Sequence, residues 1–92
     1  MIRSIRHRGL RRLHERADAS RIDPRLLEKV QRVLTALQAA TAPGDMDLPG
    51  YVLHPLTGNL RGFWSVRVSG NWRVIFRIED GHAHDIDLID YH

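Results

Sequence analysis

The sequence contains no cysteine, no apolar run long enough to cross a membrane, and only one lysine among its fourteen cationic residues. The absence of cysteine excludes disulfides, thiolate metal sites and a cysteine nucleophile. A membrane helix needs about 20 apolar residues, and no signal-peptide segment follows the basic first eight residues. We therefore expect a cytoplasmic protein without membrane contact. Its 92 residues predict a single domain, 1–92, with one small core.

The other thirteen cations are arginines, and they are unevenly distributed. Residues 1–32 hold ten basic and four acidic side chains, and residues 61–77 hold four arginines and no acid. Residues 78–92 hold five acids, so the net charge of +3 conceals strongly basic segments. The planar guanidinium suits phosphates and base edges, which favours a nucleic-acid partner. A solvated surface that uses arginine for its charge explains the composition equally well.

The apolar pattern changes its period along the chain, from helical in the first half to alternating in the second. Asp23 and Pro24 are typical of a helix start, and an apolar stripe follows them to about Thr41. Strict alternation after residue 62, with turn signals at 69–71 and 80–81, predicts an antiparallel meander. We expect helices at 7–17 and 24–41 and strands at 1–5, 63–68, 72–78 and 85–88. This order predicts an α+β fold in which two N-terminal helices pack on a small, mainly antiparallel β-sheet.

Alternation also predicts which side chains leave the core. It places Trp72 and its apolar neighbours on the buried side of their strand. The opposite face then carries Arg67, Arg73 and Arg77 on neighbouring strands. Such a cationic face suits RNA, although a solvated arginine face is the simpler interpretation.

Four short segments form a more specific pattern. They are Leu53-His54-Pro55-Leu56, Gly62-Phe63-Trp64-Ser65-Val66, Asn71-Trp72-Arg73 and a final Asp90-Tyr91-His92. Their order and spacing resemble those of the HigB toxins of bacterial toxin–antitoxin pairs, within the RelE/ParE superfamily, over the whole chain. The resemblance implies the RelE-like microbial ribonuclease fold. It also implies a ribosome-dependent endoribonuclease that cuts messenger RNA in the decoding (A) site and so inhibits translation.

The resemblance also assigns residue roles by position. The implied catalytic residues are His54, Arg73, Asp90, Tyr91 and His92. Arg73 matches a phosphate-binding arginine and Asn71 a nucleotide-contacting asparagine. Thr57 is a departure, because the family commonly has a lysine there; Arg61 in the same loop is a candidate replacement for that cation. The residues expected to bind RNA are Asn71, Thr57, Arg61, Arg67, Arg77, Arg6 and Arg8.

Cleavage of RNA needs neither metal nor cofactor, because the 2′-hydroxyl can attack the adjacent phosphorus. The reaction needs a base, an acid and a cation on the crowded phosphate. His54 and His92 are the candidates for proton transfer, and Arg73 for charge stabilisation. Asp90 is expected to orient an imidazole and Tyr91 to stack on a base. No metal site is expected, and no role is assigned to His7, His14, His82 or His84.

One difficulty follows from strict alternation. It places Asp90 and His92 on the side of Leu88, whereas Arg73 lies opposite the buried Trp72. The implied cleft needs these residues together. We therefore expect a bulge or a strand end near Ile89.

The resemblance implies two partners. One is the 70S ribosome with its messenger and ribosomal RNA. The other is a cognate antitoxin, a HigA-like helix-turn-helix protein through which alone operator DNA would be bound. Two alternatives remain open: a toxin of the same fold that poisons DNA gyrase, as in the ParE branch, and an inactive RNA- or partner-binding module. The histidine-rich pattern speaks against the first, and Thr57 makes the second credible.

Overall fold

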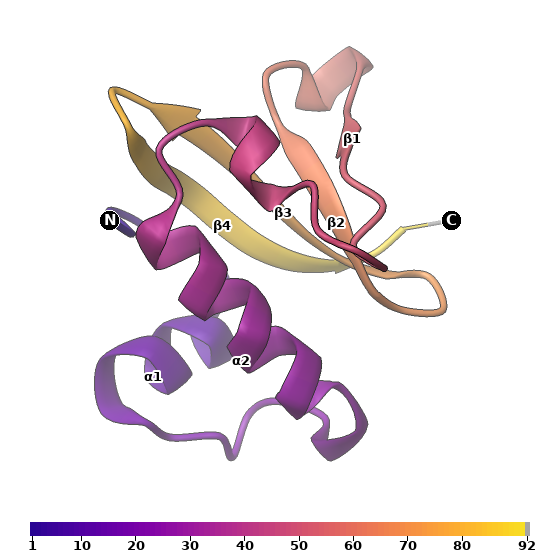
Figure 1. Cartoon of the computed structure of the whole chain (residues 1–92). Helices are drawn as coiled ribbons and strands as arrows, with labels where there is room; N and C mark the ends of the chain where they lie inside the picture. The colour runs from indigo at the N-terminus through magenta and orange to yellow at the C-terminus, as the bar shows by residue number, and fades with distance from the viewer. Residues whose placement is uncertain (92) are drawn as a thin grey trace.

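The computed structural model describes residues 1–91. Within them, two helices cover one face of a four-stranded antiparallel sheet, and all lie in one small α+β unit (Figure 1). The elements are α1 (Arg8–Arg16), α2 (Pro24–Ala39), β1 (His54–Pro55), β2 (Trp64–Ser69), β3 (Trp72–Glu79) and β4 (His82–Asp90), with two short 3-10 helices at Pro43–Met46 and Gly58–Leu60. The predicted fold class is therefore confirmed. No helix among these residues is long and apolar enough to span a membrane.

Both helices begin at side-chain caps. The Nδ1 atom of His7 accepts a hydrogen bond from the Leu10 backbone N–H at 3.1 Å, so His7, to which no role was assigned, is the cap of α1. Asp23 caps α2 as predicted, because its Oδ1 atom accepts from the Arg25 N–H at 2.9 Å. The helix ends at Ala39, two residues before the predicted end.

The strand order is β1-β2-β3-β4, and every neighbouring pair is antiparallel. The N-terminal residues lie along the free edge of β4. They form two isolated parallel bridges, Ile2 with Ala83 and Ile5 with Ile86, in place of the regular strand predicted at 1–5. β4 begins three residues earlier than predicted, and β1 was not predicted at all.

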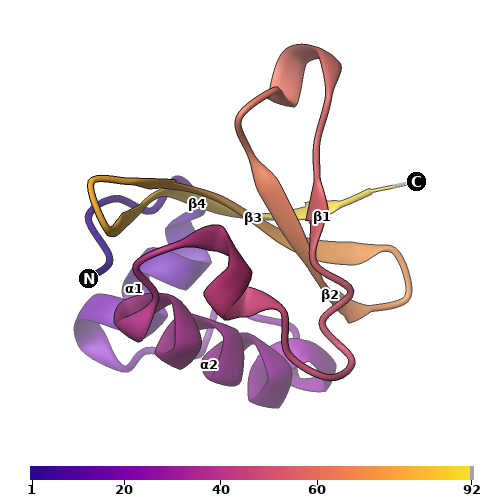
Figure 2. The ribbon, with the colours of Figure 1, turned by 45° about the horizontal axis from the view of Figure 1, so that its top comes forward.

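The two faces of the sheet are covered by different groups of residues. We call the face covered by the helices the inner face. Val66, Val74 and Phe76 of this face are fully buried against Val30 and other residues of the apolar stripe of α2. The opposite, outer face carries a second and smaller apolar cluster of Leu56, Phe63 and Ile75. Figure 2 shows the segment between β1 and β2 extending away from the helices.

Two irregularities shift the register of the sheet. The first lies after Arg67 in β2. The second lies in β4, where Asp85 and Ile86 together oppose the single residue Phe76 of β3, and Asp85 has a φ of 53°. Because this bulge adds one residue, Ala83 and Ile86 both reach the inner face although they are three positions apart.

Candidate functional site

The pairing of the strands places His54 and two arginines on the outer face. His54 of β1 lies opposite Ser65 of β2, which lies opposite Ile75 of β3. Two residues further along the strands, Arg67 lies directly opposite Arg73. With strands about 4.8 Å apart and about 3.3 Å per residue, the Cα atoms of His54 and Arg73 are about 12 Å apart. This separation leaves room for a phosphate between an imidazole and a guanidinium.

Residues 56–63, which we call the 56–63 loop, form one wall of this face. The Leu56 N–H donates to the Phe63 carbonyl at 2.9 Å, and this bond closes the loop directly beside β1. Leu56 and Phe63 pack on Ile75, so the base of the loop is anchored to the sheet. Thr57 and Arg61 are both exposed on the loop. Both residues therefore lie at the surface in the loop that directly follows β1, the strand that carries His54.

The residues predicted at the end of the chain do not all join this face. Asp90 pairs with Trp72, so it belongs to the inner face, whereas Ile89 pairs with Arg73. β4 does end near Ile89, at Asp90, but its register is regular from Asp87 onwards, and the bulge lies earlier, at Asp85. Asp90 therefore stays on the opposite face from Arg73. The expected role of His92 concerns a residue outside the described part of the chain.

Asp90, Asn71 and Tyr91 nevertheless meet at one end of the sheet. The Tyr91 N–H donates to the Asn71 carbonyl at 2.8 Å, which extends the pairing of β3 and β4 one residue past the strand. Tyr91 is 45% exposed, so its ring is available for stacking. Asn71 and Asp90 also line a cavity of about 310 Å³ beside the first turn of α2, together with Arg25, Leu26, Ser69, Gly70 and Trp72. Arg73 lies next to this sheet end, on the other face.

The arginines predicted to bind RNA fall into three different environments. Arg67 is exposed on the outer face, and Arg73 is half-buried there with one Nη1 bond to the Gly70 carbonyl at 3.2 Å. Arg77 and Arg6 are instead engaged by the carboxylate of Asp85. Arg8 lies on α1, in the helix layer on the other side of the sheet, within a cluster that also contains Arg11, Arg12, Glu15 and Arg16. The predicted RNA-binding residues therefore do not form one continuous surface.

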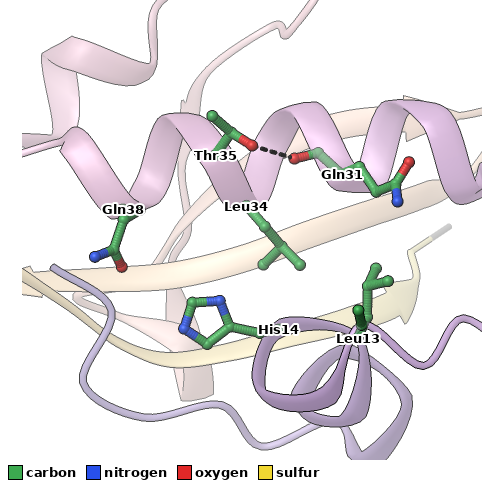
Figure 3. A pocket seen from close by; sticks show the side chains of 7 residues that line it. Leu13, His14, Gln31, Leu34, Thr35 and Gln38 are labelled. Carbon is green, nitrogen blue, oxygen red and sulfur yellow. Dashed lines mark hydrogen bonds between the residues drawn. The ribbon is translucent and has the colours of Figure 1, made fainter.

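A groove of about 550 Å³ lies between the two helices (Figure 3). Leu13 and His14 of α1 face Gln31, Leu34 and neighbouring residues of α2 across it. None of the predicted site residues within the described part of the chain lines this groove. It belongs to the helix layer, so the groove and the outer face are separate surfaces of the molecule.

The carboxylate of Asp85 lies close to two arginines, Arg77 and Arg6. Hydrogen bonds from Arg77 lower its pKa below the ordinary value of 3.8, the nearby Arg6 charge lowers it further, and partial burial opposes both effects. The same hydrogen bonds raise the pKa of Arg77. Both groups are therefore charged throughout the neutral range.

Sequence reasoning missed Asp85 and Phe63 as parts of this region. The available signal was the spacing of Ala83 and Ile86, since two core residues three positions apart break the period of two and indicate a bulge. The pattern alone did not show that the extra residue would direct a carboxylate toward Arg77.

The outer face of this small α+β domain carries a histidine and two arginines that lie opposite each other, and the comparison with known families identifies the class of protein as a toxin. The chain belongs to the HigB-like toxin family, described as the RelE-like toxins of type II toxin–antitoxin systems HigB, whose model matches residues 3–92. Among individual proteins, it is 36% identical over 92 residues to Endoribonuclease HigB of Proteus vulgaris, with all of both chains covered. It is 34% identical over 85 residues to Toxin HigB-1 of Vibrio cholerae serotype O1, with 90% of each chain covered.

Proposed function

We propose that this HigB-family toxin is an endoribonuclease that cuts messenger RNA in the A site of the ribosome. The observation that carries the proposal is that His54, Arg67 and Arg73 share the outer face. The name of the full-length relative from Proteus vulgaris supports the activity. The action takes place in the cytoplasm, where translating ribosomes are.

The proposed reaction is attack of the ribose 2′-hydroxyl on the adjacent phosphorus. The bond from phosphorus to the 5′-oxygen breaks, leaving a 2′,3′-cyclic phosphate and a 5′-hydroxyl. One of the two histidines, His54 or His92, acts as the base and accepts the proton of the 2′-hydroxyl. The other acts as the acid and donates a proton to the leaving 5′-oxygen. Arg73 stabilises the extra negative charge on the phosphate.

The remaining residues bind and orient the RNA. Arg67 contacts a neighbouring phosphate, and Arg61 supplies the cation that Thr57 does not. Asn71 and Tyr91 hold a base at the end of the sheet, where stacking on a ring is worth about 1–3 kcal/mol. Asp90 orients an imidazole from the inner-face side of that end. This arrangement requires the RNA strand to pass around the end of the sheet at Asn71.

The proposed partners are the 70S ribosome and an antitoxin. Messenger and ribosomal RNA would contact the outer face, and the arginines of α1 would meet a further stretch of ribosomal RNA. The antitoxin is a helix-turn-helix protein, and operator DNA is bound only through it. Because the helix layer and the outer face are separate surfaces, an antitoxin seated on the helices would inhibit by bulk alone.

The experiment compares defined messenger RNA on programmed ribosomes with the same RNA free in solution. We expect cleavage only on the ribosome, within the A-site codon, with 2′,3′-cyclic phosphate ends. Arg73→Gln is the matched inactive variant. Cleavage of free RNA at the same rate would refute ribosome dependence. Intact RNA together with trapped gyrase–DNA complexes would favour the gyrase alternative.

A further inference from the structure

Phe63 anchors the 56–63 loop to the outer face of the sheet. Its ring is only 7% exposed and packs with Leu56 and Ile75. Its carbonyl accepts from the Leu56 N–H, and its own N–H donates to the Leu60 carbonyl, each at 2.9 Å. Phe63 therefore anchors the base of the loop that carries Arg61 and that follows β1, where His54 pairs with Ser65.

Two guanidinium groups lie over that ring. The Cζ atom of Arg6 is 5.2 Å from the ring centroid, and the Cζ atom of Arg77 is 5.8 Å from it. Both distances fall within the roughly 6 Å range of a cation–π interaction. Arg6 comes from the N-terminal segment and Arg77 from β3, so the ring is held from two separate parts of the chain.

Asp85 holds both arginines in this arrangement. Its Oδ2 atom accepts from Arg77 Nε at 3.0 Å and from Arg77 Nη2 at 2.7 Å, while its Oδ1 atom lies 3.6 Å from Arg6 Nε. Glu79 binds the remaining Nη1 side of Arg77. The Arg77 and Asp85 side chains are only 29% and 25% exposed. With its donors engaged on both sides, the guanidinium of Arg77 has a fixed orientation.

The bulge explains how Asp85 reaches this position. Strict alternation from the buried Ala83 would direct residue 85 toward the core, but the extra residue and the φ of 53° turn its side chain toward Arg77. Aspartate tolerates this left-handed backbone better than most residues. The Asp85 N–H donates to the Ser4 hydroxyl at 2.8 Å, and the Ile86 N–H donates to the Ser4 carbonyl at 3.1 Å. The N-terminal segment thus stabilises the bulge.

We propose that Asp85, Arg77 and Arg6 form a clamp that positions the 56–63 loop and His54 for catalysis. This role replaces the direct RNA contacts first expected of Arg77 and Arg6. A phosphate approaching Arg77 would have to displace Asp85 and Glu79, and these two carboxylates repel it. The inference rests on the proposed nuclease function, and the clamp itself is a property of the free protein.

Asp85→Asn separates the two roles because they predict different cleavage rates. The amide keeps the size and the backbone tolerance of aspartate but removes the charge that holds both arginines. If Asp85 is a clamp residue, loss of its charge misplaces His54 and slows single-turnover cleavage on the ribosome about 10- to 100-fold. Ribosome affinity then stays the same or rises. If Arg77 and Arg6 instead contact RNA, the variant frees them, so binding becomes tighter and the cleavage rate is not reduced. That result would overturn the proposal.

Arg77→Gln provides the second variant, with Arg32→Gln as its control. Arg32 forms an exposed ion pair with Glu28 on α2, far from the outer face, so its replacement removes a paired arginine without touching the clamp. We expect Arg77→Gln to slow cleavage and to leave the salt dependence of ribosome binding unchanged. A loss of salt dependence equal to that of Arg67→Gln would make Arg77 an RNA contact and would overturn the proposal.

Hydrogen exchange on the free protein completes the test without ribosomes. In Asp85→Asn, the Leu56 and Phe63 amides should exchange at least about 10-fold faster, since they report loop closure, whereas the amides of α2 keep their protection. Equal acceleration in α2 would indicate general destabilisation and overturn a positioning role. If the wild type cuts no RNA, the proposed function fails, while this measurement still decides whether the clamp exists.

Discussion

Arg67 and Arg73 lie directly opposite each other on β2 and β3, and this pairing gives a prediction in which stability and function move in opposite directions. Like charges in a cross-strand pair repel each other, and an unfavourable pair of this kind costs about 0.2–1 kcal/mol. We therefore expect Arg67→Gln to stabilise the fold. For a chain of this length, the corresponding rise in Tm is about 1–8 °C.

The same substitution should weaken RNA binding. Each arginine that neutralises a phosphate contributes about 0.7 to the slope of log affinity against log salt for single-stranded RNA. Arg67→Gln should therefore reduce the magnitude of that slope by about 0.7. Such a pair would trade stability for phosphate binding, as functional sites often do.

The assay combines thermal unfolding with ribosome binding, each at several salt concentrations. The gain in Tm should be largest at low salt and should shrink as ions screen the repulsion. Arg32→Gln removes an arginine that forms a favourable ion pair with Glu28, so it should bring no such gain. A lower Tm for Arg67→Gln, or an unchanged salt slope, would refute the reasoning.

Three further predictions address the active site, the clamp and the core. His54→Ala should slow single-turnover cleavage about 10²- to 10⁴-fold and leave ribosome affinity unchanged; equal rates for variant and wild type would remove His54 from proton transfer. Because hydrogen bonds from Arg77 lower the pKa of Asp85, wild type should be more stable than Asp85→Asn at neutral pH. This advantage should disappear as the pH falls below 3.8 and through the lowered pKa, and urea unfolding across that range tests it; an advantage that persists when the carboxylate is protonated would contradict the ion pair as its source. Leu37 is fully buried under the sheet, so Leu37→Ala should cost about 2–5 kcal/mol of unfolding free energy, measured by urea, and a cost below 1 kcal/mol would mean that the site lies outside the core.

The parts of the fold that could be predicted are those in which a single periodicity decides the structure. The stripe from Leu26 to Leu37 buries one side of α2, and the sequence shows it directly. Alternation identified β2 and β3 to within one residue at each end. It also placed Arg67 and Arg73 on one face, as the structure does.

The missed features depend on pairing between distant residues. β1 has only two residues, one of them Pro55, and it is a strand only because β2 lies beside it. β4 begins at His82, and its first residues alternate polar with a small alanine, a weak strand signal. The sequence does not distinguish the carboxylate of Asp85 from other surface acids, because the positive φ of Asp85 cannot be predicted from the residue itself. The sequence likewise does not show that Arg77 is paired with Asp85 and Glu79.

The structure shows on which face of the sheet each described candidate residue lies. His54, Arg67 and Arg73 do share a surface, whereas Asp90 lies on the inner face beside Trp72. A resemblance supplies a set of positions, but only the register of β4 decides on which side of the sheet each position lies. That register depends on the bulge at Asp85, five residues before the last regular pair, Asp90 with Trp72.

The bridges between the first residues and β4 also set an order of events in biosynthesis. Ser4 bonds to Asp85 across 81 positions of sequence, so the bulge cannot close until β4 has been synthesised and has left the ribosome. The helices depend on local contacts and can form much earlier. A nascent chain can therefore form its arginine-rich helix before the bulge at Asp85 exists.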